Sequence, residues 1–331
     1  MAKIKILNKG LLTSIQDLGR KGYQEYGVPI SGVMDEYSHK IANILVNNKL
    51  NEATIEVTMI GPKIKFLDNQ MIAITGGGLL PQINGKKVKM WKNLLVKEGD
   101  ILSFSGLNKG LRSYISFAGG IDIPLVMGSK SFYKRAMIGT EIKNNHIINL
   151  KQSNFRQQRK LIKKYIPKYK KDITCRVILG PQDNLFSKKG INDLFSSKYK
   201  ISNDFHRMGI RLDGKNIEHK NSADIISDGL GKGAIQVPGN GRPIIMMSDS
   251  QTTGGYTKIG YVIKKDLNKL AQLKPGDFVR FKQINIKKAQ KIYIKEKNKI
   301  DKIKKIVSIK GQKYNIYING KKHSVTVQEI K

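Results

Sequence analysis

The apolar residues of this chain occur in short runs, and this pattern restricts its possible folds more than any other feature. Runs such as IKFL (64–67), MIAIT (71–75) and SYISFAG (113–119) are bounded by glycine, asparagine, aspartate or proline. They recur at roughly 8–15 residue intervals, a spacing typical of an antiparallel barrel or sandwich. No run approaches the roughly 18 apolar residues of a membrane-spanning helix. The sequence therefore predicts a mostly-β protein without a membrane partner.

Local signals add a few short helices and one tight hairpin. Asp35 is expected to be the N-cap of a helix in 35–48, because its side-chain oxygen can accept from free backbone N–H groups. The apolar residues that share one face of this helix are Tyr37, Ile41, Ile44 and Leu45. A second helix is expected within 183–197. Asn84-Gly85 predicts a two-residue hairpin turn between strands.

The length of 331 residues predicts two domains of ordinary size. The expected divisions are an N-terminal β-barrel part over 1–150, a basic connector over 151–172, a C-terminal barrel part over 173–282, and a tail over 283–331. We expect the lysine-rich stretch 283–306 to be a solvated linker, with a basic arm that docks a partner as the alternative. A final strand pair should turn at Asn319-Gly320.

The chain carries 61 basic and 25 acidic residues, a formal charge of +36. Such an excess raises the question of a nucleic-acid partner. Only ten of the basic residues are arginine, and the lysines are spread over the whole chain. Specific nucleic-acid recognition favours arginine forks and interleaved aromatic residues, and neither is concentrated here. We therefore expect no specific nucleic-acid partner, and we interpret the lysine excess as a codon bias.

The remaining composition argues against several kinds of site and predicts a cytoplasmic protein. Cys175 is the only cysteine, so an internal disulfide framework is excluded, and its place in ITCRVILG predicts buried packing. The first residues, MAKIKILNKG, lack the features of a secretory signal. The histidines lack metal-ligand spacing, so no metal site is expected; they are His39, His146, His206, His219 and His323.

The densest polar segment is TSIQDLGRKGYQEYGVPISGVMD, residues 13–35. Glycines at short intervals let the backbone turn tightly and approach a ligand. Gln16, Asp17 and Arg20 supply an amide, a carboxylate and a guanidinium, which suit charge-assisted hydrogen bonds to a carboxylate or amide. The alternative is a structural ion pair between Asp17 and Arg20 that fixes a loop.

A second polar segment, residues 229–260, contains GAIQVPGNGRP followed by QTTGGY. The apolar run PIIMM should be a buried strand that leads into a turn rich in hydroxyl groups, a common way to present site residues. The candidate residues here are Gln236, Gln251, Thr252 and Thr253. The alternative is that Gly254-Gly255 forms an ordinary hairpin turn.

Several motifs accompany these two segments in order between about Lys5 and Phe281: EATIEVTMIGPKIKF (52–66), RSYISFAGGIDIPLVMGSKS (112–131), VILGPQDNLF (177–186), HRMGIRLDG (206–214) and IISDGLGKGAIQVP (225–238). Together they resemble the family of the C component of 5-oxoprolinase. This family is also called allophanate hydrolase subunit 2 or biotin-dependent carboxyltransferase, and it includes the antagonist of a sporulation-kinase inhibitor. The resemblance implies two cyclophilin-like β-barrel subdomains with a few short helices.

The resemblance also implies a reaction and partners. The implied reaction is the opening of 5-oxo-L-proline to L-glutamate with ATP and Mg, carried out with a homologue of the B component and with the A component of 5-oxoprolinase. We expect no activity from this chain alone. The implied catalytic residues are Asp17, Arg20 and Asp35, and the implied substrate-binding residues are Gln16, Arg207, Gln236, Gln251, Thr252 and Thr253. Arg20 would clamp a carboxylate or phosphate, and Asp17 or Asp35 would move a proton or orient Arg20. Gln236 and the threonine pair would bind the lactam amide.

Two other functions stay open at this point. One is a biotin-dependent carboxyltransferase that acts on urea or a similar small amide, although Val88-Lys89-Met90 lacks the first methionine of a biotin-carrier hairpin. The other is a regulatory protein that sequesters a kinase inhibitor similar to the B component. The glycine run Thr75–Gly78 lacks the spacing and the Lys-Ser/Thr end of a P-loop, and we interpret it as a turn.

Overall fold

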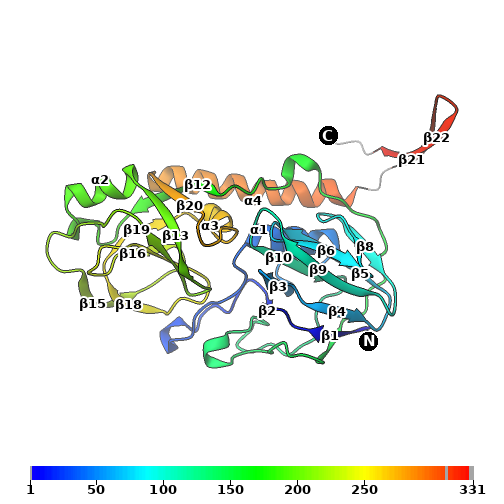
Figure 1. The fold of residues 1–331 in the computed structure, drawn as a ribbon, viewed down its shortest axis with the longest axis horizontal. Coiled ribbons are helices and arrows are strands. Elements are labelled where there is room, and N and C mark those ends of the chain that lie inside the picture. The colour runs from blue at the N-terminus through cyan, green and yellow to red at the C-terminus, as the bar shows by residue number, and fades with distance from the viewer. Residues whose placement is uncertain (1, 310–311, 328–331) are drawn as a thin grey trace.

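The computed structural model describes residues 2–309 and 312–327. The first half of the chain folds into two antiparallel sheets (Figure 1). The six-stranded sheet, ordered β11-β1-β4-β9-β6-β7, contains β1 (Ala2–Asn8), β4 (Lys63–Phe66), β6 (Leu79–Ile83), β7 (Lys86–Lys87), β9 (Ile101–Leu107) and β11 (Ile147–Leu150). The five-stranded sheet, ordered β2-β3-β10-β5-β8, contains β2 (Leu12–Gln16), β3 (Thr54–Thr58), β5 (Gln70–Gly76), β8 (Asn93–Val96) and β10 (Arg112–Phe117). Side chains from both sheets, such as Ile4, Phe66, Ile55 and Ile115, share one core.

The second half forms a closed seven-stranded barrel. Its order is β12-β19-β16-β17-β14-β13-β20, with β12 (Asp172–Leu179), β13 (Lys198–Phe205), β14 (Gly209–Asp213), β16 (Ala234–Gln236), β17 (Ile244–Met246), β19 (Lys258–Val262) and β20 (Phe278–Gln283). Its core contains Val177, Leu212, Ile235 and Ile259. A separate ribbon pairs β15 (Asp224–Gly229) with β18 (Thr253–Tyr256). The mostly-β prediction is confirmed, and closure removes the unpaired strand edges of this sheet.

Four α-helices and four short 3-10 turns lie among the described residues. They are α1 (Glu36–Leu45), α2 (Lys188–Ser196), α3 (Lys264–Leu270), α4 (Ile286–Ser308), η1 (Gln24–Tyr26), η2 (Lys134–Ala136), η3 (Lys163–Tyr165) and η4 (Asp183–Leu185). The predicted N-cap is confirmed, because the Asp35 side chain accepts a hydrogen bond from the backbone N–H of Ser38 at 3.1 Å. The hairpin is confirmed as well: Asn84 and Gly85 both have positive φ and join β6 to β7. None of these helices is long and apolar enough to cross a bilayer.

The solvated linker predicted over 283–306 is wrong, because this segment forms the 23-residue helix α4. The Asn285 side chain caps it by accepting from the N–H of Lys288 at 2.9 Å. The buried face consists of Ile300, Ile303, Ile306 and Val307. Helix α4 runs along both halves of the molecule and contacts α1 and α3 (Figure 1). Helix α4 is also longer than the short helices that we expected. Its many solvent-facing lysines made the helical spacing of the apolar residues difficult to recognise in the sequence.

Two segments outside the sheets bear on the predicted divisions. Beyond α4, β21 (Gln312–Ile318) pairs with β22 (Lys321–Val327) around Asn319-Gly320, as predicted. In the connector between β11 and β12, Leu161 is buried and Tyr169 packs against the cluster that contains α1. The connector is therefore attached to the first half, and the predicted domain boundaries themselves stay a prediction.

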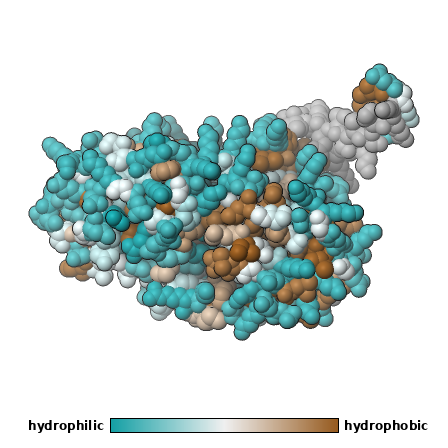
Figure 2. Space-filling model, in the orientation of Figure 1, coloured by the Kyte–Doolittle hydropathy of each residue, from teal (hydrophilic) through white to brown (hydrophobic). Residues whose placement is uncertain are grey.

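The surface of the molecule is mostly hydrophilic on the face shown in Figure 2. The upper edge, along which α4 runs in Figure 1, is mainly hydrophilic with a few hydrophobic side chains between. Hydrophobic side chains gather near the middle of this face, below α4. The lysine excess is thus accommodated on solvent-facing positions, and Cys175 is buried in the barrel core as predicted.

Candidate functional site

A polar cleft of about 430 Å³ lies between the two halves. Its walls come from the loop before α1, from α1 itself, from the loops around residues 230–232 and 248–252, and from α3 and α4. The polar and charged lining residues are Lys21, Gln24, Ser31, Glu36, Lys40, Lys232, Ser248, Ser250, Gln251, Thr252, Lys264 and Asn268. Four lysines against one glutamate give this lining a formal excess of positive charge. Such a lining favours an anionic ligand that also accepts hydrogen bonds.

Asp17 holds the loop that forms one wall of the cleft. Its carboxylate accepts hydrogen bonds from the hydroxyl groups of Ser129 and Ser131, both at 2.6 Å. It also accepts from the backbone N–H groups of Gly19 at 2.8 Å and Lys130 at 2.7 Å. Burial opposes ionisation, but these four hydrogen bonds lower the pKa of Asp17. Because four hydrogen bonds hold its carboxylate, Asp17 fixes the loop in this structure.

Arg20 and Gln16 lie beneath the same wall. Arg20 is 1% exposed, and its Nη2 donates to the carbonyl oxygen of Ser131 at 2.5 Å rather than to Asp17. Its Nε and Nη1 are buried without a hydrogen-bond partner in the described structure. Burial lowers the pKa of Arg20. Gln16 donates to the carbonyl oxygen of Phe132 at 2.8 Å, and its Oε1 is also unpartnered among the described residues.

Arg207 joins the two halves through buried carboxylates that the sequence interpretation missed. It forms a two-point ion pair with Asp249, at 2.8 Å from Nε and 2.9 Å from Nη2. Its Nη1 contacts Glu56 on β3, and Nη2 donates to the carbonyl oxygen of Gly32 at 2.6 Å. Burial opposes the charge, but Asp249 and Glu56 raise the pKa of Arg207. Burial likewise opposes ionisation of Glu56, and Arg207 lowers the pKa of Glu56.

Asp35 belongs to a second buried network at the same junction. Its carboxylate accepts from the hydroxyl of Ser38 at 2.6 Å and from Nε2 of Gln272 on the barrel side at 2.8 Å. Burial outweighs these hydrogen bonds and raises the pKa of Asp35. The hydroxyl of Tyr114 accepts from the Asp35 N–H and donates to Glu56, each at 2.8 Å. Within the described residues Asp35 therefore caps α1 and ties it to the barrel, rather than orienting a guanidinium of the first loop.

The late polar segment is divided among three places. Gln251 and Thr252 line the cleft. Gln236 is buried in the barrel on β16, where its Nε2 donates to the carbonyl oxygen of Tyr256 at 3.4 Å. Thr253 lies on the outer ribbon, paired with Gly229. The alternative of a hairpin turn at Gly254-Gly255 is wrong, because both glycines are within strand β18.

Several cleft residues were missed by the sequence interpretation, above all Lys232. It lies in a motif that carried the family resemblance, GLGKGAIQ, but one lysine among so many gave no separate signal. The serines Ser31, Ser248 and Ser250 were equally inconspicuous. Their approach to one another depends on how the two halves pack, which no local pattern encodes.

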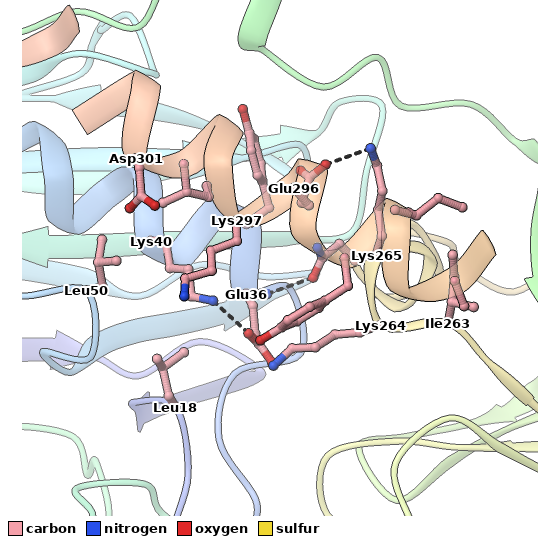
Figure 3. A pocket seen from close by; sticks show the side chains of 16 residues that line it. Leu18, Glu36, Lys40, Leu50, Ile263, Lys264, Lys265, Glu296, Lys297 and Asp301 are labelled. Carbon is pink, nitrogen blue, oxygen red and sulfur yellow. Dashed lines mark hydrogen bonds and ion pairs between the residues drawn. The ribbon is translucent and has the colours of Figure 1, made fainter. Parts of the chain in front are cut away.

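A second cavity, of about 310 Å³, adjoins the polar cleft and lies between α1, α3 and α4 (Figure 3). Its lining is mostly apolar, with Leu18, Leu50 and Ile263 among its side chains. Glu36 stands where the two cavities meet, with Lys40 at 2.9 Å and Lys264 at 3.1 Å. Burial opposes ionisation, but Lys40, Lys232 and Lys264 lower the pKa of Glu36 to about 2. No cluster of three metal-ligating side chains occurs among the residues described.

The fold and the cleft define a protein of two β-rich halves that share one cationic cleft. The sequence model of the family described as "Carboxyltransferase domain, subdomain A and B" matches residues 26–283. The chain belongs to this family. The match includes parts of both halves and runs from the loop before α1 to the last strand of the barrel, leaving out β1 and β2.

The chain is similar to two proteins named as the C subunit of 5-oxoprolinase. It is 32% identical to the one from Escherichia coli, covering 87% of this chain and 93% of that protein. It is 30% identical to the one from Haemophilus influenzae, covering 93% and 100%. The solved urea amidolyase of Kluyveromyces lactis superposes with a TM-score of 0.85 at 30% identity, covering 91% of this chain. The chain spans only 20% of that much longer protein.

Proposed function

We propose that this chain is the C component of an ATP-dependent 5-oxoprolinase that cleaves 5-oxo-L-proline to L-glutamate together with the A and B components. The observation that carries the proposal is the cleft, which surrounds a small volume with four lysines and several hydroxyl and amide groups. Two relatives that this chain matches over nearly their whole length support it, since they are named as the C subunit of 5-oxoprolinase. Relatives named urea amidolyase are matched over only 17% of their length.

The chemistry of the substrate fits the lining of the cleft. 5-Oxoproline carries a carboxylate, which the lysine excess attracts, and a lactam amide, which needs both donors and acceptors. Opening the lactam places negative charge on the amide oxygen, and preorganised donors stabilise such charge in a site shielded from water. Gln251 and Thr252 are proposed to bind the amide, because they are the predicted substrate-binding residues that line the cleft.

The other predicted residues are proposed to act through the walls of the cleft. Arg20, with two nitrogens that lack a partner among the described residues, would add positive charge beneath the first loop. Gln16, Asp17 and Asp35 would hold that loop and the start of α1 in place. Arg207, Gln236 and the backbone of Thr253 would fix the position of the barrel loops.

ATP and Mg belong to the proposed complex, and the described residues of this chain do not form a phosphate loop for them. The run Thr75–Gly78 is filled from both sides: a Cβ on Gly77 would lie 2.4 Å from the Tyr169 ring, and one on Gly78 would lie 2.5 Å from the Leu111 backbone. Thr75 and Gly76 end strand β5, and only Gly77 and Gly78 form the packed bend that leads to β6, so the turn interpreted from the sequence holds for these two glycines.

The test is co-expression of this chain with the A and B components, followed by an assay of ATP-dependent glutamate formation from 5-oxoproline. We expect activity only in the complete complex. Gln251→Ala or Thr252→Ala should lower kcat/KM at least about tenfold, since a buried polar substrate group would lose its partner. Thr253→Ala, one residue outside the lining, is the matched control and should stay within a few-fold. Tight partner binding without turnover would favour the regulatory function instead.

A second function, biotin-dependent carboxylation of urea or another small amide, is favoured by one specific observation. The solved urea carboxylase of Kluyveromyces lactis superposes on 91% of this chain with a TM-score of 0.85. Turnover that requires biotin and a carrier, with urea as substrate and no need for the A component, would support this function. Glutamate formation without biotin would exclude it.

A further inference from the structure

Lys232 projects from the turn between β15 and β16 into the junction of the two halves. Its Nζ donates to the carbonyl oxygen of Val33 at 3.0 Å, and the same oxygen accepts from the hydroxyl of Ser248 at 3.1 Å. The turn is fixed at Gly233, where φ is +97° and a Cβ would lie 2.8 Å from the carbonyl oxygen of Val262. Lys232 is thus held by a rigid turn and reaches across to the loop before α1.

The ammonium of Lys232 has donors to spare. An ammonium carries three N–H donors, and the structure shows one of them in use. No carboxylate of the described residues lies within ion-pair distance of Lys232. Glu36, the acid of the cleft, is paired with Lys40 and Lys264 instead. The buried Glu56 is paired with Arg207. Two donors therefore remain for a ligand in the cleft.

The charges around Lys232 come from every element packed against it. Glu36 and Lys40 belong to α1, Lys264 to α3, Glu56 to β3, and Arg207 to the loop between β13 and β14. Burial, together with Arg207 and Lys264, lowers the pKa of Lys232 to about 8, although Glu36 and Glu56 oppose the shift. An added anion beside Nζ would stabilise the charged form and raise this pKa.

We propose that Lys232 binds the carboxylate of the small anionic amide that occupies the cleft, with the hydroxyl of Ser250 beside it for the second oxygen atom. This inference rests on the proposed function and names the residue that selects its substrate class. Neutral amides of the same shape are rejected, since they leave the ammonium without a partner in a partly desolvated site.

Binding of the carboxylate depends on pH, because only the protonated form of Lys232 pairs with it. The carboxylate pairs with the ammonium form, so affinity is full below about pH 8 and falls as the free site loses its proton above that value. A lysine in water would keep its charge to roughly pH 10. The loss of affinity should therefore begin about two pH units earlier than for a solvent-exposed lysine.

Competitive lysine labelling measures both the pKa of Lys232 and its protection by a bound carboxylate. It is applied to the full chain, alone and in the complex with its partners. Acetic anhydride is applied between pH 6 and pH 11, and each lysine is quantified by peptide mass spectrometry, with the exposed Lys86 and Lys220 as controls. We expect half-maximal labelling of Lys232 near pH 8, at a lower pH than for either control lysine. Excess L-5-oxoproline should slow labelling of Lys232 at least fivefold, whereas neutral 2-pyrrolidinone should not.

Variants separate this inference from the proposed function. Lys232→Met should raise the KM of the complex for 5-oxoproline at least tenfold, and Lys232→Arg should recover part of the loss. Lys264→Met, at the rim and paired with Glu36, is the matched control and should have a smaller effect. If no carboxylate slows the labelling of Lys232, either in the chain alone or in the complex, the inference is overturned. Glutamate formation by the complex would still uphold the proposed function in that case. Protection by acetate equal to that by 5-oxoproline supports an anion site at Lys232 and counts against 5-oxoproline as the substrate.

Discussion

Replacing Arg207 by methionine should destabilise the protein strongly, because Arg207 neutralises two buried carboxylates from different halves. Glu56 is 1% exposed and Asp249 is 5% exposed, so both carboxylates are buried, and without the guanidinium only Arg112, at 3.9 Å from Glu56, stays within ion-pair distance among the described residues. Methionine keeps most of the apolar stem but supplies no charge. Removing one partner of a buried ion pair typically costs about 3–5 kcal/mol, because the remaining charge stays buried. We expect Arg207→Met to lower the free energy of unfolding by about 3–5 kcal/mol.

Urea unfolding followed by circular dichroism measures this loss, with Arg211→Met as the matched control. Arg211 lies on the next strand and pairs with Asp204 at 2.5 Å, but both side chains are about half exposed, at 51% and 54%. Exposed ion pairs contribute at most about 1 kcal/mol, so the control should be nearly unchanged. Trp91 fluorescence reports unfolding of the first half, whereas the far-UV signal reports both halves, so a difference between the two transitions would show that the halves unfold separately.

The pH dependence gives an independent check with a fixed sign. Arg207 lowers the pKa of Glu56 in the folded protein, so this pairing stabilises the wild type above the unfolded pKa and is lost as pH falls through the folded pKa. In Arg207→Met the buried Glu56 is costly when ionised, and protonation relieves that cost. The stability gap between variant and wild type should therefore be largest near neutral pH and shrink as pH falls through the raised folded pKa of Glu56 in the variant and then through the lowered one in the wild type. A loss below about 1 kcal/mol, equal to that of Arg211→Met, would refute the reasoning.

Three further outcomes test other parts of the structure by the same unfolding measurement. Ile303→Ala, in the fully buried face of α4, should cost about 2–5 kcal/mol, whereas Ile294→Ala, 56% exposed on the same helix, should stay within about 0.5 kcal/mol; equal effects would contradict the packed helix. Gly19→Ala should cost about 1–3 kcal/mol more than Gly22→Ala, because both have positive φ but only the Cβ at Gly19 would lie 2.5 Å from a carbonyl oxygen. Glu36→Gln should reduce the loss of folding free energy between about pH 4.5 and pH 2. The folded pKa of Glu36 is about 2, so in the wild type its ion pairs stabilise the protein fully above about pH 4.5 and are lost as pH falls to about 2. An unchanged acid profile would show that these pairs contribute little.

Much of the fold could be predicted because its signals are local. Strand runs bounded by turn residues, the Asp35 cap and the two Asn-Gly turns each act over a few residues, and each was confirmed. Helix α4 was missed for a physical reason. Its buried apolar residues lie mainly in the second half of a lysine-rich segment. They stabilise the helix only when another surface of the protein packs against them.

The candidate site was predictable only in part. The two polar segments do lie at one junction, and Gln251 and Thr252 line its cleft. Asp17 and Arg207, however, are engaged by partners more than 40 residues away in sequence, which no spacing rule could supply. Lys232 gave no signal beside so many other lysines, because its distinguishing property is the environment rather than the residue type.

The sequence by itself determined the strand content, the tight turns, the position of the first helix cap and the family to which the chain belongs. These follow from residue preferences and ordered motifs that do not depend on distant contacts. Only the tertiary structure decided which polar residues are buried supports and which face the cleft. Burial and charge pairing depend on how the two halves meet, and a lysine without a carboxylate partner among the described residues can be recognised only once all its neighbours are in place.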